Sequence, residues 1–170
     1  PRGGHHAGDR RPTEDGTLGI DIKGPRDIEA MRVVCAMAAE TLTLVGERLR
    51  PGMTTDEINA FVHEDTIRRG AIPSPLNYRG FPKSVCTSVN HVVCHGIPGP
   101  QVLKDGDIIN VDVTTYFGGF HGDTSATFYI GAPSAEARHV TEVARKSLEL
   151  GIAEVREGAR FGDIGAAIQE

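Results

Sequence analysis

The 170-residue chain contains only three cysteines, Cys35, Cys86 and Cys94, an odd number without the spacing of a metal finger. It also lacks an apolar run long enough to span a membrane, and no secretory signal is visible near its start. Reduced cysteines are typical of the cytoplasm, so a cytoplasmic protein is expected. The sequence therefore gives no support to a secreted disulfide scaffold or a membrane protein.

Dense blocks of lysine and arginine are missing too, and the net charge is −5 with neutral histidines. Direct binding of nucleic acid is therefore not expected. No Gly-x-Ser-x-Gly elbow, phosphate-binding loop or dinucleotide-binding glycine pattern occurs in a supporting context, which leaves serine hydrolysis and nucleotide binding without support. The length suits one domain with a real hydrophobic core.

Hydrophobic spacing predicts helices at both ends of the chain. Residues 1–20 lack periodicity and are expected to form a flexible leader. A helix is predicted from Pro25, and a capping box formed by Thr54 and Glu57 opens a second helix that ends near Gly70. The residues predicted to face the core from these helices are Ile28, Met31, Val34, Cys35, Ala38, Leu42, Val45, Ile58, Phe61 and Val62.

Strands and loops are predicted for residues 71–100, followed by a hairpin, a third helix after Ser134 and a fourth helix near Phe161. The third helix is expected to turn one apolar face inward. Its members are Val140, Val143, Ala144, Leu148 and Ile152. Residues 38–64 match residues 144–170 at a constant shift, with the order helix, Arg-x-Gly, helix kept in both. This repeat predicts a duplicated, two-halved fold whose second half has only begun.

Asp112 and Asp123 lie in two β-branched runs separated by Gly118 and Gly119, a pattern that predicts a β-hairpin. If the loop spans Tyr116 to Gly119, the two aspartates face each other directly across the strands. Carboxylates so close repel each other and need a cation or a shared proton between them, and a pair of divalent metals fits the gap. The alternative is a pair of exposed, solvated strand carboxylates.

Three histidines accompany the hairpin. His95 lies where a strand breaks into a Gly/Pro loop, and it can donate a hydrogen bond to a substrate or be a core histidine bonded to backbone. Strict strand alternation would place His91 on the same face, for which a rim or structural role is favoured. His121 precedes Asp123 by two positions, which predicts a role beside the ligands rather than as one.

Cys86, Tyr78 and Phe81 combine a thiol with two aromatic rings and can form a small pocket for an unbranched thioether side chain. Ordinary core packing is the alternative. Cys35 and Cys94 are predicted to be core residues.

Three segments closely resemble the type I, bacterial-like methionine aminopeptidases: 78–84, 90–98, and 105–107 through 120–124. The resemblance runs from residue 22 to the end of the chain. It implies an α+β pita-bread fold, with two pseudo-symmetric halves around a dinuclear metal centre, over residues 21–170. It also implies removal of the initiator methionine from peptides and nascent proteins, with possible transient ribosome contact.

Residue by residue, the resemblance implies that Asp112 chelates one metal and Asp123 bridges two divalent ions, which are cobalt, manganese, iron or zinc. It implies that His95 contacts the substrate near the scissile amide. The side chains implied to line the methionine pocket are Tyr78, Phe81 and Cys86. Thr114 is implied to lie beside the ligands on the same strand face.

The family takes a histidine, two glutamates and a further catalytic histidine from its second half, and Glu170 does not correspond to any of them. Two carboxylates are too few to hold two metals firmly, so this segment alone is expected to be inactive and to belong to a longer enzyme. Alternatives are a proline-specific aminopeptidase of the same fold and a non-catalytic pita-bread module that binds a partner.

Overall fold

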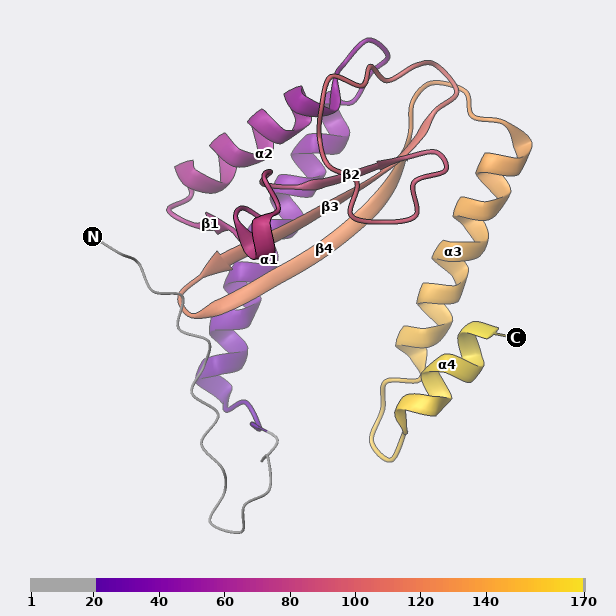
Figure 1. The fold of residues 1–170 in the computed structure, drawn as a ribbon. Coiled ribbons are helices and arrows are strands. Elements are labelled where there is room, and N and C mark those ends of the chain that lie inside the picture. Colours follow the sequence, from indigo (N-terminus) through magenta and orange to yellow (C-terminus); the bar gives the residue numbers. More distant parts are fainter. Residues whose placement is uncertain (1–20, 170) are drawn as a thin grey trace.

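The computed structural model describes residues 21–169, so the predicted leader, residues 1–20, lies outside the described residues. Helices and strands follow the predicted order along the chain, with an added 3₁₀ turn, η1 (Figure 1). The elements are α1 (Pro25–Arg48), α2 (Thr55–Arg68), β1 (Ile72–Pro73), η1 (Tyr78–Gly80), β2 (Cys86–Val89), β3 (Ile108–Phe117), β4 (Phe120–Tyr129), α3 (Ala135–Ala153) and α4 (Phe161–Gln169).

The sheet is built around β3, and every strand pair is antiparallel. β4 pairs with β3 along its whole length, from Ile108 opposite Tyr129 to Phe117 opposite Phe120. The short strands β1 and β2 share the other edge of β3, where β2 pairs at 109–112 and β1 at 115–116. The long β3–β4 hairpin is therefore the frame on which the other strands are placed.

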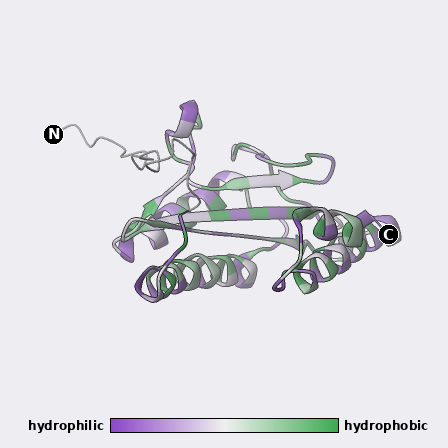
Figure 2. Ribbon diagram, turned by 90° about the horizontal axis from the view of Figure 1, so that it is seen from below, coloured by the Kyte–Doolittle hydropathy of each residue, from purple (hydrophilic) through white to green (hydrophobic). Residues whose placement is uncertain are grey.

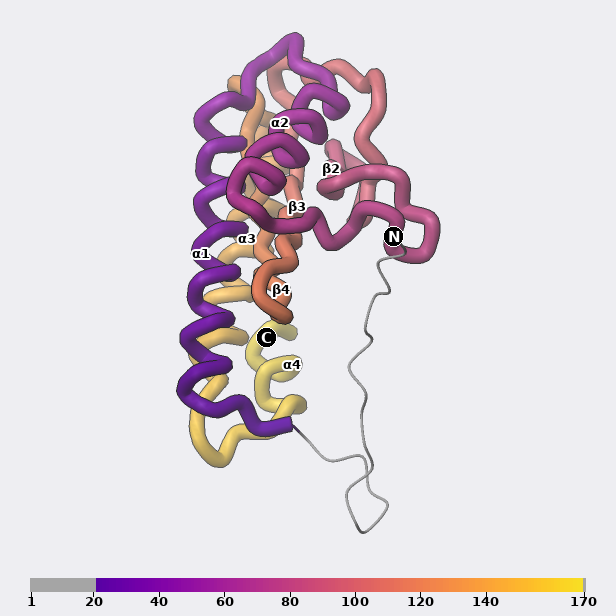
Figure 3. Tube along the Cα trace, turned by 90° about the vertical axis from the view of Figure 1, so that its left-hand side faces the viewer, coloured from indigo at the N-terminus to yellow at the C-terminus, as the bar shows by residue number. Residues whose placement is uncertain are grey.

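Polar and apolar residues alternate along β3 (Figure 2), and every second residue of residues 109–115 is buried while those between are only half-buried. Ile109, Val111 and Val113 are fully buried and pack with residues of α1 and α2 in one core cluster. Asn110, Asp112 and Thr114 alternate with them and face away from α1, which lies along one side of the hairpin (Figure 3). The polar face is therefore free to carry a site.

The predicted starts of the first two helices are confirmed. Pro25 opens α1, and Thr54 caps α2: Glu57 N donates to Thr54 Oγ1, and Thr54 N donates to the Glu57 carboxylate. The predictions that Ile28 and Cys35 face the core are wrong, because both are exposed; Cys35 lies beside buried Val34. Cys94 is exposed as well.

The predicted inward face of α3 is also wrong: Val140, Val143, Ala144, Leu148 and Ile152 are exposed. Among the described residues, α3 stands beside the sheet and packs chiefly against α4, with Gly151 meeting Ile164 and Ile168 (Figure 1). The periodicity marks an apolar face, but the described part of the chain supplies no layer to cover it.

The predicted repeat agrees with the backbone. Both α1–α2 and α3–α4 are helix pairs joined by a short turn, and the second helices start at the equivalent residues Thr55 and Phe161. Equivalent glycines in the two turns, Gly52 and Gly158, take positive φ angles of 91° and 83°. A left-handed residue in the same place in both turns is what a duplicated unit requires.

Asp65 joins α1 to α2 through a buried carboxylate. It accepts hydrogen bonds from Thr41 Oγ1 and Arg69 Nε, both at 2.7 Å, and from Arg68. Arg69 also reaches Glu40 of α1 at 2.5 Å. Burial alone would raise the pKa of Asp65, but the bonds from Thr41, Arg69 and Arg68 outweigh it and hold the pKa below its ordinary value.

Asp65→Ala should lower the free energy of unfolding by about 2 kcal/mol at neutral pH, because Thr41 and Arg69 lose their buried acceptor. Since the folded pKa of Asp65 is depressed, its contribution is present at neutral pH and is lost as the pH falls below about 4. Urea unfolding of Asp65→Ala and the unmodified chain, at neutral pH and below about pH 4, measures how their difference in free energy of unfolding changes with pH. The neighbouring exposed Glu64→Ala is the control, and equal effects of the two variants at neutral pH would refute the interpretation.

Candidate metal centre

The turn between β3 and β4 sets the register of the two aspartates. It contains only Gly118 and Gly119, both with positive φ (60° and 91°), which is the geometry of a two-residue hairpin turn. The predicted loop from Tyr116 to Gly119 is therefore wrong, since Tyr116 pairs with His121. Asp112 does not face Asp123 directly.

Asp112 lies opposite Ser125, and Asp123 lies opposite Thr114. Because partners directly opposite share a face, Asp112 and Asp123 remain on the same polar face as diagonal neighbours. Side chains at such diagonal positions still reach each other. The corrected register thus keeps the two carboxylates together.

The two carboxylates differ in their surroundings. Asp112 is half-buried, and burial, followed by the negative charge of Asp123 and a bond to it, raises its pKa. Asp123 is more exposed and accepts a hydrogen bond of 2.8 Å from Thr114 Oγ1. One oxygen of Asp123 is therefore already held by its cross-strand neighbour, which fixes the orientation of its carboxylate.

Cys86 lies opposite Asp112 on the other neighbouring strand, β2. Burial raises the pKa of the Cys86 thiol to about 11, with further contributions from the charges of Asp112, Cys94 and Asp123. At neutral pH Cys86 is consequently a neutral thiol, suited to a soft apolar wall rather than to nucleophilic attack.

His95 reaches the same region from a loop, because β2 ends at Val89. The loop returns along β2, with Thr87 N donating to Gly96 O at 2.8 Å, and His95 takes a left-handed conformation with φ of 53°. A Cβ on Gly96 would lie 2.1 Å from Thr87 O, so only glycine permits this approach. The side chain of His95 is exposed, and a positive charge on its ring would lower the pKa of Asp112 against the larger raising effects of burial and of Asp123.

The prediction that strand alternation puts His91 and His95 on one face does not hold, because residues 90–99 contain no strand. His91 is exposed in the turn after β2.

Tyr78 and Phe81 lie together in the tight turn around η1, where Phe81 N donates to Tyr78 O at 2.9 Å. Tyr78 is 64% exposed and carries the guanidinium of Arg79 over its ring, while Phe81 is half-buried. Cys86 is buried on the sheet beside Asp112. The structure thus places one of the three predicted pocket residues next to the carboxylates and the other two on a turn at the surface.

His121 pairs through Nδ1 with Ser74 Oγ at 2.8 Å, and its ring lies 4.9 Å from that of Tyr116. Ser74 was not among the residues predicted from sequence. It is 47 positions from His121, and no local pattern marks a contact over such a separation.

Divalent cations prefer carboxylate oxygens of the kind that Asp112 and Asp123 offer, and a cation between them would neutralise two neighbouring negative charges. Within residues 21–169, however, no group of three or more histidines, cysteines, aspartates and glutamates is placed to hold a metal ion. The described residues therefore fit a metal as a partial ligand set of two carboxylates.

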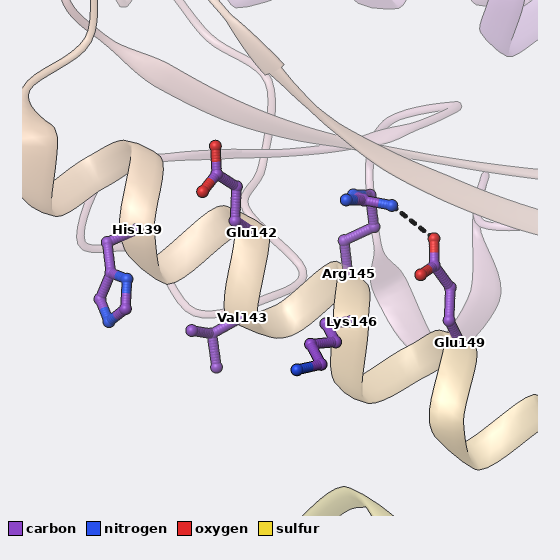
Figure 4. A pocket seen from close by; sticks show the side chains of 6 residues that line it. All are labelled: His139, Glu142, Val143, Arg145, Lys146 and Glu149. Atoms are coloured by element: carbon purple, nitrogen blue, oxygen red, sulfur yellow. Dashed lines mark hydrogen bonds and ion pairs between the residues drawn. The ribbon is translucent and has the colours of Figure 1, made fainter.

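Two surface hollows lie away from this cluster. One is lined by a single helix, α3, with His139, Val143 and Lys146 pointing one way and the Arg145–Glu149 ion pair lying on another side (Figure 4). The other lies between α1 and α2 beside Asp65. Neither hollow is lined by Asp112, Asp123, Cys86 or His95. Separately, within residues 21–169 no helix is long and apolar enough to cross a membrane.

Comparison with known proteins places these residues in a family. The model of metallopeptidase family M24 matches residues 29–170. The chain belongs to this family. Its metal-dependent peptidase chemistry agrees with the paired carboxylates on the polar face.

Methionine aminopeptidase 1D, mitochondrial, of Dictyostelium discoideum is 51% identical over 150 residues, covering 88% of this chain and 37% of the relative. The crystal structure of methionine aminopeptidase from Rickettsia prowazekii superposes with a TM-score of 0.87 at 46% identity, covering 89% of this chain and 61% of that one. The predicted pita-bread fold is confirmed. Prolidase from Pyrococcus furiosus, with a TM-score of 0.76 at 18% identity, shares that fold.

The chain spans 37–44% of the length of the first curated relatives that it matches. It carries the part of the fold that holds Asp112 and Asp123, and its resemblance to the methionine enzymes is far stronger than to prolidase.

Proposed function

We propose that this chain forms the first part of a methionine aminopeptidase, which removes the N-terminal methionine from peptides and nascent proteins. The observation that carries the proposal is that Asp112, Asp123 and Cys86 lie beside one another on three neighbouring strands, in a chain about 50% identical to methionine aminopeptidases.

Asp112 and Asp123 would hold two divalent metals, cobalt, manganese, iron or zinc, and the remaining ligands would come from outside the described residues. When bound, such ions supply Lewis acidity and an activated water for peptide hydrolysis. Thr114 keeps the Asp123 carboxylate oriented through its 2.8 Å bond. The two acids thereby present their oxygens from a rigid hairpin rather than from a loop.

His95 would donate a hydrogen bond to the oxygen of the scissile carbonyl, where negative charge grows as the bond is attacked. Its loop is held against β2 through Gly96, which fixes the backbone next to the exposed ring. The neutral Cys86 thiol would form one wall of the methionine pocket, with Tyr78 and Phe81 supplying aromatic surface suited to a thioether.

A cytoplasmic location and transient contact with the ribosome stay predictions. Relatives named mitochondrial in animals and chloroplastic in Arabidopsis thaliana have about the same identity to this chain, so similarity does not select a compartment.

The proposal is tested with a chimera in which residues 21–169 replace the aligned part of the Rickettsia prowazekii enzyme. It should release methionine from Met-Gly-Met with added manganese or cobalt, whereas the 170-residue chain alone should release none, because two carboxylates make too weak a site. The Rickettsia enzyme is the positive control, and circular dichroism confirms folding. A folded chimera that cleaves Xaa-Pro peptides instead, or activity of the isolated chain, would contradict the proposal.

A further inference from the structure

Ser74 is hydrogen-bonded to both strands of the β3–β4 hairpin, which carries Asp112 and Asp123. It follows β1, and its backbone N donates to Thr114 O of β3 at 2.9 Å. Its hydroxyl pairs with His121 Nδ1 of β4 at 2.8 Å. One residue thus bonds the strand that carries Asp112 and the strand that carries Asp123.

The His121 ring is fixed from two sides. Tyr116 lies directly opposite on β3, with ring centroids 4.9 Å apart and an interplanar angle of 48°. Ser74 holds the Nδ1 edge. An exposed histidine with both contacts has little freedom to swing away from the hairpin.

The Ser74–His121 hydrogen bond joins two parts of the proposed site. Two residues beyond His121 is Asp123, whose carboxylate is oriented by Thr114. The turn 75–81 follows Ser74 directly. Within it, Tyr78 N donates to Pro75 O at 3.0 Å and Asn77 N donates to Phe81 O at 2.8 Å. The Ser74–His121 contact therefore lies between the metal-ligand strand and the turn that carries Tyr78 and Phe81.

We propose that Ser74 and His121 are positioning residues that hold the turn 75–81 at a fixed place relative to Asp123, and so set the selectivity for the first side chain of the substrate. The inference rests on the proposed function. Neither residue touches the reacting atoms. They act by fixing the distance between Tyr78 and Phe81 of the proposed pocket and the proposed metal ligands, which decides how well a methionine side chain fits compared with other apolar side chains.

Hydrogen exchange in the 170-residue chain tests the contact without any activity. The reporters are the amides of Ser74, Leu76, Asn77, Tyr78 and Phe81, all hydrogen-bonded. Ser74→Ala removes the hydroxyl, His121→Phe keeps a ring against Tyr116 without the nitrogen, and Ser74→Thr keeps the hydroxyl. The amides of Gly52 and Leu103, bonded in a distant turn, serve as internal controls.

Ser74→Ala and His121→Phe should each speed exchange of the reporter amides about three- to tenfold, the effect of one hydrogen bond. Ser74→Thr should exchange like the unmodified chain, and the double variant should exchange no faster than either single one, because both remove the same contact. The control amides should not change. Unchanged reporter exchange in the single variants, or additive effects in the double variant, would overturn the positioning role.

Kinetics of the same variants in the chimera test the selectivity. Ser74→Ala should raise KM for Met-Gly-Met several-fold with kcat nearly unchanged, and should narrow the preference for methionine over leucine, while manganese affinity stays the same. A loss confined to kcat and metal affinity would mean that Ser74 acts on Asp123, and would overturn the assignment to selectivity. Failure of the proposed function looks different: the unmodified chimera would be inactive while the exchange results still decide the contact.

Discussion

Gly122→Ala is expected to force α1 away from the β3–β4 hairpin and to lower the free energy of unfolding by about 3 kcal/mol. A Cβ at Gly122 would lie 2.4 Å from Val34 O and 2.8 Å from Cys35 Cα. These are backbone atoms of a long helix, so no side-chain rotation can relieve the clash. Because Gly122 immediately precedes Asp123, the same displacement should disturb the carboxylate pair.

Thermal unfolding of the 170-residue chain measures the loss, which for a chain of this size is a fall in Tm of roughly 6–12 °C. Gly165→Ala in α4 is the matched control, since a Cβ there meets nothing within 4 Å. Alanine also favours a helix over glycine, so the control should be neutral or slightly stabilising. An unchanged Tm for Gly122→Ala would show that α1 does not pack this closely on β4.

The helices could be predicted because their signals are local. Pro25 and the capping box at Thr54 each act within one turn of chain, and the structure starts both helices where these residues place them. The repeat could be predicted for the same reason, since it copies local signals.

Predictions that needed the neighbours of an element were less successful. The apolar spacing of α3 identifies a face but not what covers it, and Val140 and Leu148 are exposed among the described residues. The register of the hairpin depended on whether Tyr116 belongs to the turn or to the strand. A tyrosine is compatible with either place, and the structure shows that Tyr116 belongs to the strand, because the turn contains only Gly118 and Gly119.

In the candidate site, too, local features could be predicted from the sequence and contacts between distant segments could not. Asp112 and Asp123 could be paired from sequence because they share one hairpin. The contacts of Gly96 with β2 and of Ser74 with His121 join residues that are distant in the chain, and a glycine or serine alone carries no signal of such a partner. Their positions follow only from how the loop 90–99 and the segment after β1 fold back on the sheet.

Asp112→Asn should have opposite effects without and with metal. Without metal, burial and the neighbouring Asp123 charge raise the pKa of Asp112, so its ionised form opposes folding at neutral pH. The folded chain holds this proton to a higher pH than the unfolded chain does, and the contribution of the group to stability falls as the pH rises through that range. Removing the charge should therefore stabilise the metal-free chain, by up to about 1 kcal/mol or 2–4 °C in Tm.

With millimolar Mn²⁺ the order should reverse, because a cation between the carboxylates stabilises the folded form only if both charges are present. The Tm of the unmodified chain should rise slightly, as expected for a weak site of two carboxylates, while Asp112→Asn, which keeps only one of them, should show almost no rise. Glu142→Gln on exposed α3 removes the same charge away from the hairpin and should behave like the unmodified chain in both conditions. If Asp112→Asn destabilises the metal-free chain, the two carboxylates do not repel each other in the fold. If Mn²⁺ raises the Tm of Asp112→Asn as much as that of the unmodified chain, Asp112 is not a ligand.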